Sequence, residues 1–370
     1  MNTLTKQQTA SPATAYFGFA RKWSTPVFLV LILGLIGFFI WWLNIPFIED
    51  IFTSSVITLI MVLGFQLYMG NSGILNWSYV GYVGIGAFSA AIFSMTPAVK
   101  AMQIPTMYPF LINLNLPFLL ALLAGALIAM AVAAVIAWPL MRLSDSVGAI
   151  TQFALLIVIN VILSQWSEVT NGPRTFTLGG TRFTSFEIVI GIAVLVIVGV
   201  FWFKESSLGL KLRASRDDRY AARSSGVNFV GTRYIGYVIS AFIGGLAGGL
   251  YSHYILSITA ASFYLSELFV ILSMLVIGGS MSVSGAFFGT LLVTLVRQGL
   301  RQVELGLTRS GFEASGSTEI VVAVMMVVFL IWRANGITGG GELTWQAVKR
   351  LFAKTKAIRH TPNTRTEESK

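Results

Sequence analysis

Long apolar runs alternate with short polar segments along most of this chain. A helix that crosses the hydrocarbon core of a bilayer needs about 17–25 predominantly apolar residues. Ten runs meet or approach that length: 27–44, 51–69, 78–95, 117–141, 148–166, 186–203, 233–256, 266–279, 282–300 and 318–332. The pattern predicts an all-α integral membrane protein with about ten transmembrane helices. Because some runs are short or rich in glycine, we expect some of these helices to be broken or re-entrant.

Two of the apolar runs are interrupted by glycine and small polar residues. One interruption opens the stretch "GNSGILNWSYVGYVGIGAFSA" (70–90) and the other opens "GGSMSVSGAFFGT" (278–290). An unsatisfied polar group in lipid costs several kcal/mol, so these segments must face protein or water. Interrupted helices in comparable positions of two halves are typical of a transport site. The predicted pathway residues are Gly70, Asn71, Ser72, Gly73, Asn76, Gly278, Gly279, Ser280 and Ser284.

A second interpretation stays open for the glycine-rich stretches. Small residues let transmembrane helices approach closely, without any role in transport. The stretches "GYVGIGAFSAA" and "SAFIGGLAGGLYS" fit this packing pattern. Glu267 opens one apolar run, and we include it among the candidate pathway residues, although a long side chain at a span end also reaches water.

Composition and charge placement decide the class of protein. Hydrophobic residues make up 55% of the chain and charged residues 11%, which is too apolar for a soluble protein of 370 residues. The net charge of +10 sits mainly in segments between or beyond apolar runs, which indicates cytoplasmic loops rather than nucleic-acid binding. We therefore expect both termini and the basic segment 204–233 in the cytoplasm. The predicted units are an N-terminal segment (1–26), a transmembrane domain (27–333) and a partly disordered C-terminal tail (334–370).

The basic segment "SLGLKLRASRDDRYAARSSGVNF" predicts a short cytoplasmic helix over about 215–226. Ser215 and Asp218 resemble a capping box, and Asp217 and Asp218 suit the first turn of a helix. Gly226 fits a left-handed stop. Such a helix suits docking on a membrane surface or in a groove of a partner protein, and a solvated basic loop is the alternative.

Several chemistries are excluded. The chain has no cysteine and only two histidines, so it predicts no disulfide and no histidine-cluster metal site. No phosphate-binding loop motif occurs, and no nucleophile and base are suitably placed for an enzyme. A secondary transporter driven by an ion gradient remains the alternative function, although no span carries paired central carboxylates.

The motifs together resemble the larger, M-type membrane permease subunit of branched-chain amino acid-type ABC importers. The resemblance covers about residues 51–340. It is carried by "GNSGILNWSYVGYVGIGAF", "GLKLRASRDDRYAARSSGV" and "ELFVILSMLVIGGSMSVSGAFFG". The chain departs from the family pattern at Asn76, Ser78, Tyr79 and Ala286, and Tyr79 takes the position of a family histidine in the pathway. The family also transports urea, short amides and other small organic solutes.

The resemblance implies a role as one subunit of an importer. Its partners would be a second permease subunit, two ATP-binding subunits and a periplasmic substrate-binding protein, in a bacterial inner membrane. ATP and magnesium would bind the ATPase, so no cofactor and no enzymatic activity are expected in this chain. The residues implied to couple to the ATPase are Arg213, Arg216, Asp217, Asp218, Arg219, Ala221, Ala222 and Gly226.

Overall fold

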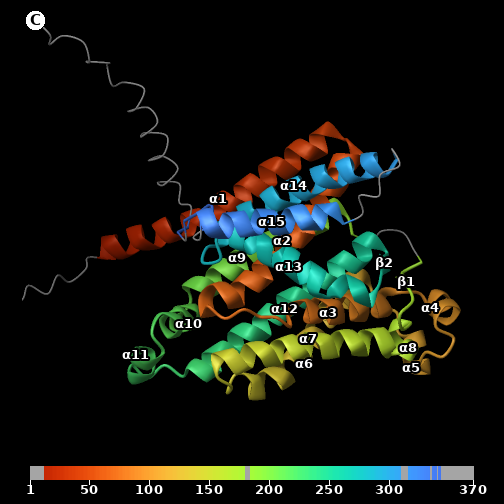
Figure 1. Cartoon of the computed structure of the whole chain (residues 1–370), viewed down its shortest axis with the longest axis horizontal. Coiled ribbons are helices and arrows are strands. Elements are labelled where there is room, and N and C mark those ends of the chain that lie inside the picture. Colours follow the sequence, from red (N-terminus) through yellow and green to blue (C-terminus); the bar gives the residue numbers. More distant parts are fainter. Residues whose placement is uncertain (1–11, 180–183, 310–315, 334–335, 340, 343–370) are drawn as a thin grey trace, which may run out of the picture.

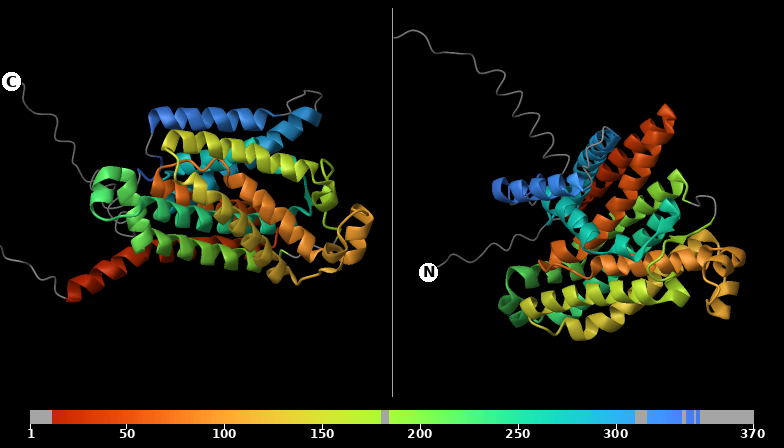
Figure 2. Two further views of the ribbon diagram at one scale, coloured as in Figure 1. Left: turned by 90° about the horizontal axis from the view of Figure 1, so that it is seen from below. Right: turned by 45° about the vertical axis from the view of Figure 1, so that its right-hand side comes forward.

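Helices account for most of the described chain. A computed structural model describes residues 12–179, 184–309, 316–333, 336–339 and 341–342. The major helices are α1 (Pro12–Leu43), α2 (Pro46–Ser72), α3 (Tyr79–Ser94), α6 (Phe118–Leu140), α7 (Asp145–Gln165), α9 (Phe186–Glu205), α12 (Phe229–Ile255), α13 (Leu265–Gly278), α14 (Val283–Arg309) and α15 (Ser317–Trp332). Most of these helices lie side by side in one bundle, with α1 more strongly tilted (Figures 1 and 2).

The ten helices correspond to the ten predicted spans. Within the described residues, eight helical segments are long and apolar enough to cross a membrane, and α3 and α15 are shorter apolar helices. Large apolar side chains such as Leu35, Leu127 and Val158 lie exposed on the outer helices. An apolar exterior suits a surface in contact with lipid. The predicted all-α membrane fold is therefore confirmed.

Two ends of the bundle carry different structures (Figure 1). At one end, which we call the basic end, lie α10 (Ser207–Asp217) and α11 (Arg219–Ser224). The opposite, capped end carries short elements that join the spans. These are α4 (Pro97–Gln103), α5 (Pro109–Asn113), α8 (Ser167–Thr170), β1 (Phe176–Thr177), β2 (Ser257–Ile258) and the 3₁₀ helix η1 (Ala260–Phe263).

The capped end is ordered by contacts between segments distant in sequence. Strands β1 and β2 pair antiparallel, with Phe176 opposite Ile258. The backbone N–H of Thr177 donates to Oε1 of Gln103 at 3.2 Å, which joins β1 to α4. Segments 96–116 and 167–185 therefore form an ordered cap in their described residues; residues 180–183 lie outside the described part of the chain.

Helices α2, α3 and α12 form the centre of the bundle because small residues let them approach closely. A Cβ at Gly86 of α3 would overlap the backbone of Gly245 of α12, and a Cβ at Gly248 would overlap the carbonyl of Val83. These glycines belong to "GYVGIGAFSAA" and "SAFIGGLAGGLYS". The structure supports the packing interpretation for both stretches.

Both terminal segments are described only in part. Helix α1 begins at Pro12, so the segment 1–26, expected to precede the first span, is helical over its described part; residues 1–11 lie outside it. Proline at position 26 does not end the helix, although it removes one backbone donor. The described residues of the expected tail, 336–339 and 341–342, contact α13 and α14, whereas 343–370 lie outside the described residues.

Candidate functional site

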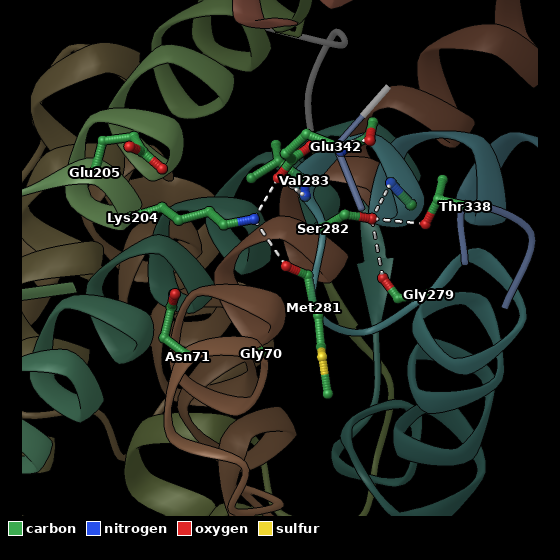
Figure 3. A network of polar contacts seen from close by, with 12 residues as sticks. Gly70, Asn71, Lys204, Glu205, Gly279, Met281, Ser282, Val283, Thr338 and Glu342 are labelled. Atoms are coloured by element: carbon green, nitrogen blue, oxygen red, sulfur yellow. Dashed lines mark hydrogen bonds and ion pairs between the residues drawn. The ribbon is translucent and has the colours of Figure 1, made fainter. Parts of the chain in front are cut away.

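The two predicted interruptions meet in the structure, near the basic end. Helix α2 ends at Ser72 and α3 starts at Tyr79, while α13 ends at Gly278 and α14 starts at Val283. A Cβ at Gly70 would overlap the carbonyl oxygen of Ser280, so only glycine permits this contact. Figure 3 shows Gly70 and Asn71 beside the α13–α14 turn. Both interruptions were predicted from the sequence, and the fold places them in contact.

In the first interruption, small polar side chains cap the broken helix. Gly73 adopts the left-handed conformation, with φ of 71°, and its N–H donates to the carbonyl of Met69 at 2.9 Å. Asn71 Nδ2 donates to the carbonyl of Leu67 at 2.8 Å, and Ser72 Oγ accepts from the N–H of Ile74 at 3.2 Å. The Gly73 bond satisfies a carbonyl that the end of the helix leaves free, and the two side-chain bonds further order the turn.

Hydroxyl groups continue the polar network from this turn into α12. Ser78 Oγ donates to Asn76 Oδ1 at 2.9 Å and lies 2.5 Å from the hydroxyl of Tyr237, which lies 3.0 Å from that of Tyr82. Tyr79 instead donates to the carbonyl of Met61 at 2.7 Å and is fully buried. Tyr82 and Tyr237 were not predicted from the sequence, because tyrosine inside an apolar run resembles ordinary core.

Three buried amides at or next to the first interruption keep atoms without a hydrogen-bond partner, and Gln152 Oε1 on α7 is another such atom among the described residues. The atoms at or next to the interruption are Asn71 Oδ1, Asn76 Nδ2 and both amide atoms of Gln66. Gln66 lies one turn before Gly70, and its Nε2 is near the space that a Cβ of Gly70 would fill. The sequence analysis missed Gln66, although a single amide within "SSVITLIMVLGFQLYM" was a visible signal. Burying an unpaired amide costs about 1–3 kcal/mol, so these groups are candidates for binding a polar solute.

The second interruption is occupied by the chain itself. Gly279 has φ of 117°, which favours glycine. The carbonyl of Gly278 accepts hydrogen bonds from Thr338, and Ser284 donates from its N–H and Oγ to the carboxylate of Glu342. These predicted pathway residues are therefore held by the C-terminal segment.

Glu267 does not belong to this cluster. It lies in the first turn of α13, about 16 Å along the helix from Gly278. Its carboxylate lies 4.0 Å from the guanidinium of Arg297 on α14. The structure thus pairs Glu267 with Arg297 and places it away from the meeting point of the two interruptions.

The cytoplasmic helix expected over about 215–226 is instead two helices. Helix α10 begins at Ser207 and ends at Asp217. The next residue, Asp218, has an extended backbone and separates α10 from α11. The Asp218 carboxylate accepts hydrogen bonds from the N–H groups of Tyr220 and Ala221 and so caps α11. Ser215, predicted as the cap, donates to the carbonyl of Leu212 within α10. A carboxylate able to accept from free N–H groups thus starts a new helix at Asp218.

Gly226 follows α11 with φ of 78°, as the sequence predicted for a helix stop. The N–H of Gly226 donates to the carbonyl of Arg223 at 3.0 Å. The end of the predicted segment is therefore correct, while its beginning and its continuity are not.

The predicted coupling arginines fasten α10 and α11 to the rest of the chain. Arg216 Nη1 donates to the carbonyl of Gly70 at 2.9 Å, which links α10 to the first interruption. Its Nη2 pairs with Asp217 at 3.0 Å. Arg213 donates to the carbonyl of Lys204 at 2.8 Å. Arg216 therefore connects the predicted coupling segment and the predicted pathway directly.

Helix α11 is held through one carboxylate at the start of α7. Asp145 Oδ1 lies 2.8 Å from guanidinium nitrogens of both Arg219 and Arg233. The guanidinium groups of both arginines also lie over the ring of Phe229, at 4.7 and 5.2 Å from its centroid. These contacts fix the position of α11 relative to the bundle.

One face of α10–α11 remains exposed at the basic end. Tyr220 is 84% exposed, and Leu210 and Ala221 are also exposed. Ala222, by contrast, is only 6% exposed and packs against its own chain. The two neighbouring alanines, predicted to face the ATPase together, therefore point in different directions.

No metal chemistry emerges from the described residues. They contain no group of three or more His, Asp or Glu side chains that could hold a metal ion. His253 is buried, 2.6 Å from Ser94 Oγ and 2.7 Å from the carbonyl of Gly249. The Ser94 contact joins α12 to α3, and both contacts indicate a structural role for His253.

Comparison with known proteins agrees with this architecture. The family model described as "Branched-chain amino acid transport system / permease component" matches residues 47–332. No solved structure matches the chain significantly.

The curated relatives have low sequence identity to this chain, but the alignments extend over most of it. The chain is 23% identical over 321 residues to the "High-affinity branched-chain amino acid transport system permease protein LivM" of Salmonella typhimurium and of Escherichia coli K12. Each alignment covers 78% of this chain and 69% of the relative. It is 22% identical over 231 residues to a "Probable branched-chain amino acid transport permease protein LivH" of Methanocaldococcus jannaschii, covering 58% of this chain and 70% of the relative.

Proposed function

This chain belongs to the family of branched-chain amino acid transport system permease components, and from that membership we propose that it is the permease subunit of an ATP-driven (ABC) importer. It forms the translocation pathway for a small polar solute of the branched-chain amino acid, urea or short-amide class. A second permease, two ATP-binding subunits and a periplasmic binding protein complete the importer in a bacterial inner membrane. ATP and magnesium act in the partner ATPase.

The observation that carries this proposal is the link from α10 to the two interruptions. Arg216 of α10 bonds the carbonyl of Gly70, and Gly70 packs against Ser280 of the second interruption. The C-terminus of a helix favours a nearby cation, so this contact suits the end of α2. A displacement of α10 by the ATPase is thereby passed to the segments that line the pathway.

The solute class follows from the polar groups near the interruptions. Gln66, Asn71 and Asn76 offer amide donors and acceptors without a fixed charge. Such groups suit uncharged or zwitterionic polar molecules better than ions, which need charged partners when desolvated. Proteoliposome uptake of labelled leucine, urea and acetamide would identify the class.

The ATPase is proposed to dock on the exposed face of α10–α11, around Tyr220 and Ala221. Ala221→Trp is expected to weaken docking on the order of tenfold, because close-packed interfaces tolerate added volume poorly. Co-purification of the ATPase at graded concentrations measures this loss. Ala101→Trp, at an exposed alanine of α4 on the capped end, is the matched control and should bind the ATPase normally.

Two results would overturn the proposal. Normal ATPase binding and stimulated hydrolysis with Ala221→Trp would exclude this face as the docking surface. Uptake that proceeds without ATP but stops when an ionophore collapses ion gradients would identify a secondary transporter instead.

A further inference from the structure

The described part of the C-terminal segment, residues 336–339 and 341–342, returns from α15 onto the α13–α14 turn. The N–H of Ile337 donates to the carbonyl of Ile277 at 2.9 Å, and the N–H of Thr338 donates to the carbonyl of Gly278 at 3.2 Å. The hydroxyls of Thr338 and Ser282 lie 2.8 Å apart. A Cβ at Gly336 would overlap Gly279, so the two backbones touch. The segment thereby supplies partners to carbonyls at the end of α13 that the helix leaves free.

Glu342 caps the other side of the same turn. Its carboxylate accepts hydrogen bonds from the N–H of Val283 at 2.9 Å and from the N–H and Oγ of Ser284 at 3.1 and 2.9 Å. Burial raises the pKa of Glu342, but the charge of Lys204 and these hydrogen bonds lower it more, so the pKa lies below its ordinary value. A carboxylate at a helix N-terminus also interacts favourably with the helix dipole.

Lys204 joins this cap to the basic end. Its ammonium group pairs with the Glu342 carboxylate and donates to the carbonyl of Met281 at 2.8 Å, as Figure 3 shows. The side chain is only 6% exposed. Lys204 lies in the last turn of α9, directly before α10, and its carbonyl accepts a hydrogen bond from Arg213 of α10. A buried ion pair with its other polar groups satisfied is costly to break.

We propose that Lys204 and Glu342 form a fixed brace that makes the α13–α14 turn and the α9–α10 junction move as one unit. Arg216 provides the corresponding link to the α2–α3 turn through Gly70. Both helix interruptions are therefore attached to the α9–α10 region by a cation that binds a backbone carbonyl. The role in transmission rests on the proposed function, whereas the brace itself does not. Lys204 and Glu342 are positioning residues, since they act through the turn and need not touch the solute.

A disulfide can test whether the brace stays closed. The native chain has no cysteine, so Ser282→Cys/Thr338→Cys provides the only thiol pair. Mild oxidation is expected to form the bond in most molecules. ATP-driven uptake after oxidation should stay within twofold of the reduced protein, and each single cysteine variant serves as control. Loss of uptake on oxidation with recovery on reduction would show that the segment must open, which overturns the fixed brace.

Removing either charge tests whether the pair holds the segment. Lys204→Met and Glu342→Gln, each placed in the double-cysteine background, are expected to lower the disulfide yield at least threefold at a fixed oxidation time. Lys204→Arg should retain most of the yield, since a cation remains. Lys211→Met removes an exposed lysine of α10 and is the matched control. An unchanged yield with Lys204→Met would refute the brace without any transport assay.

The coupling of ATP hydrolysis to solute uptake gives a second test of the proposal. This test places Lys204→Met in the otherwise unaltered, cysteine-free chain, reconstituted in proteoliposomes. Uptake is expected to fall at least tenfold, while the ATPase stays bound and hydrolyses ATP at no less than half the normal rate. If this variant transports as much solute per ATP hydrolysed as the native chain, the transmission role is refuted. If the unaltered chain shows no ATP-driven uptake at all, the proposed function fails, and the disulfide yields still decide whether the brace exists.

Discussion

Single buried polar residues distinguish this bundle from an ordinary apolar core. Gln66 is fully buried in α2, and neither of its amide atoms has a hydrogen-bond partner within the described structure. A buried group left unsatisfied at such a cost calls for an explanation such as local strain, a functional role or a bound water. Lys100 at the capped end is the opposite case, because it is buried but donates to the carbonyls of Leu111 and Leu114. The two residues lead to different predictions.

Gln66→Leu should separate stability from transport. Removal of an unpaired buried amide is expected to leave the free energy of unfolding unchanged or raise it by about 1–3 kcal/mol. Uptake should nevertheless fall on the order of tenfold if the amide contacts the solute. Thermal unfolding and uptake are measured on the same preparation. Gln152→Leu removes another buried amide with an unpartnered oxygen, on α7 and outside the two interruptions, and should transport normally; equal uptake by both variants would reject a solute contact for Gln66.

Lys100 should make stability depend on pH. Burial lowers the pKa of Lys100 to about 8, from 10.5 for an ordinary lysine. Between these values the unfolded chain binds more protons than the folded chain, so the free energy of unfolding rises with pH across this window. The thermal midpoint of the native protein should therefore rise more between pH 8 and pH 10 than that of Lys100→Met. The exposed Lys211→Met should follow the native protein, and equal slopes for all three proteins would contradict the burial effect.

At the scale of elements, α11 depends on contacts outside itself. It has six residues, and isolated helices of that length are unstable in water. Asp218 supplies its cap, and Asp145 holds Arg219 of α11 and Arg233 of α12. The geometry of the proposed ATPase surface therefore depends on these two carboxylates.

Asp218→Ala should disturb this surface while Tyr220 and Ala221, the residues proposed to meet the ATPase, stay unchanged. Loss of an N-cap costs about 1 kcal/mol of helix stability, so we expect ATPase binding to weaken by roughly fivefold. Asn is an equally good cap, and Asp218→Asn should bind nearly as well as the native chain. The measurement is retention of the ATPase on immobilised permease. Equal binding by Asp218→Ala would show that docking does not require an ordered α11.

At the scale of the whole molecule, the two ends of the bundle differ in charge and in the short elements that cover them. The basic end carries α10 and α11 with their arginines, and the capped end carries the short helices and the two-residue strands (Figures 1 and 2). Positively charged segments favour the cytoplasmic side during membrane insertion. This asymmetry predicts one orientation for the entire bundle.

Cysteine labelling in intact cells tests that orientation. Ser224→Cys at the basic end should resist an impermeant thiol reagent until the membrane is permeabilised. Met102→Cys at the capped end should react from outside, because residue 102 is 86% exposed. Prompt labelling of Ser224→Cys with protection of Met102→Cys would reverse the proposed orientation.

The sequence by itself determined the class of fold, the number of apolar helices and the two interruptions. These follow from local patterns: a span requires a certain length of apolar residues, and glycine and serine cannot lie in lipid unpaired. The stop at Gly226 was also predictable, because glycine alone adopts positive φ at little cost. The family motifs added the permease class, which the match over residues 47–332 confirms.

Only the tertiary structure decided which of these features act together. Gly70 meets Ser280, Arg216 reaches Gly70, and Glu342 caps α14 from 59 residues beyond Val283. Such contacts depend on how helices pack, and no local pattern specifies them. The same reason explains why the predicted cap was wrong and why two neighbouring alanines differ: Asp218, not Ser215, accepts from the free N–H groups of α11, and Ala222 is buried beside an exposed Ala221. Glu267 likewise pairs with Arg297, because α13 packs along α14. Its place in the first turn of α13 keeps Glu267 away from the interruptions.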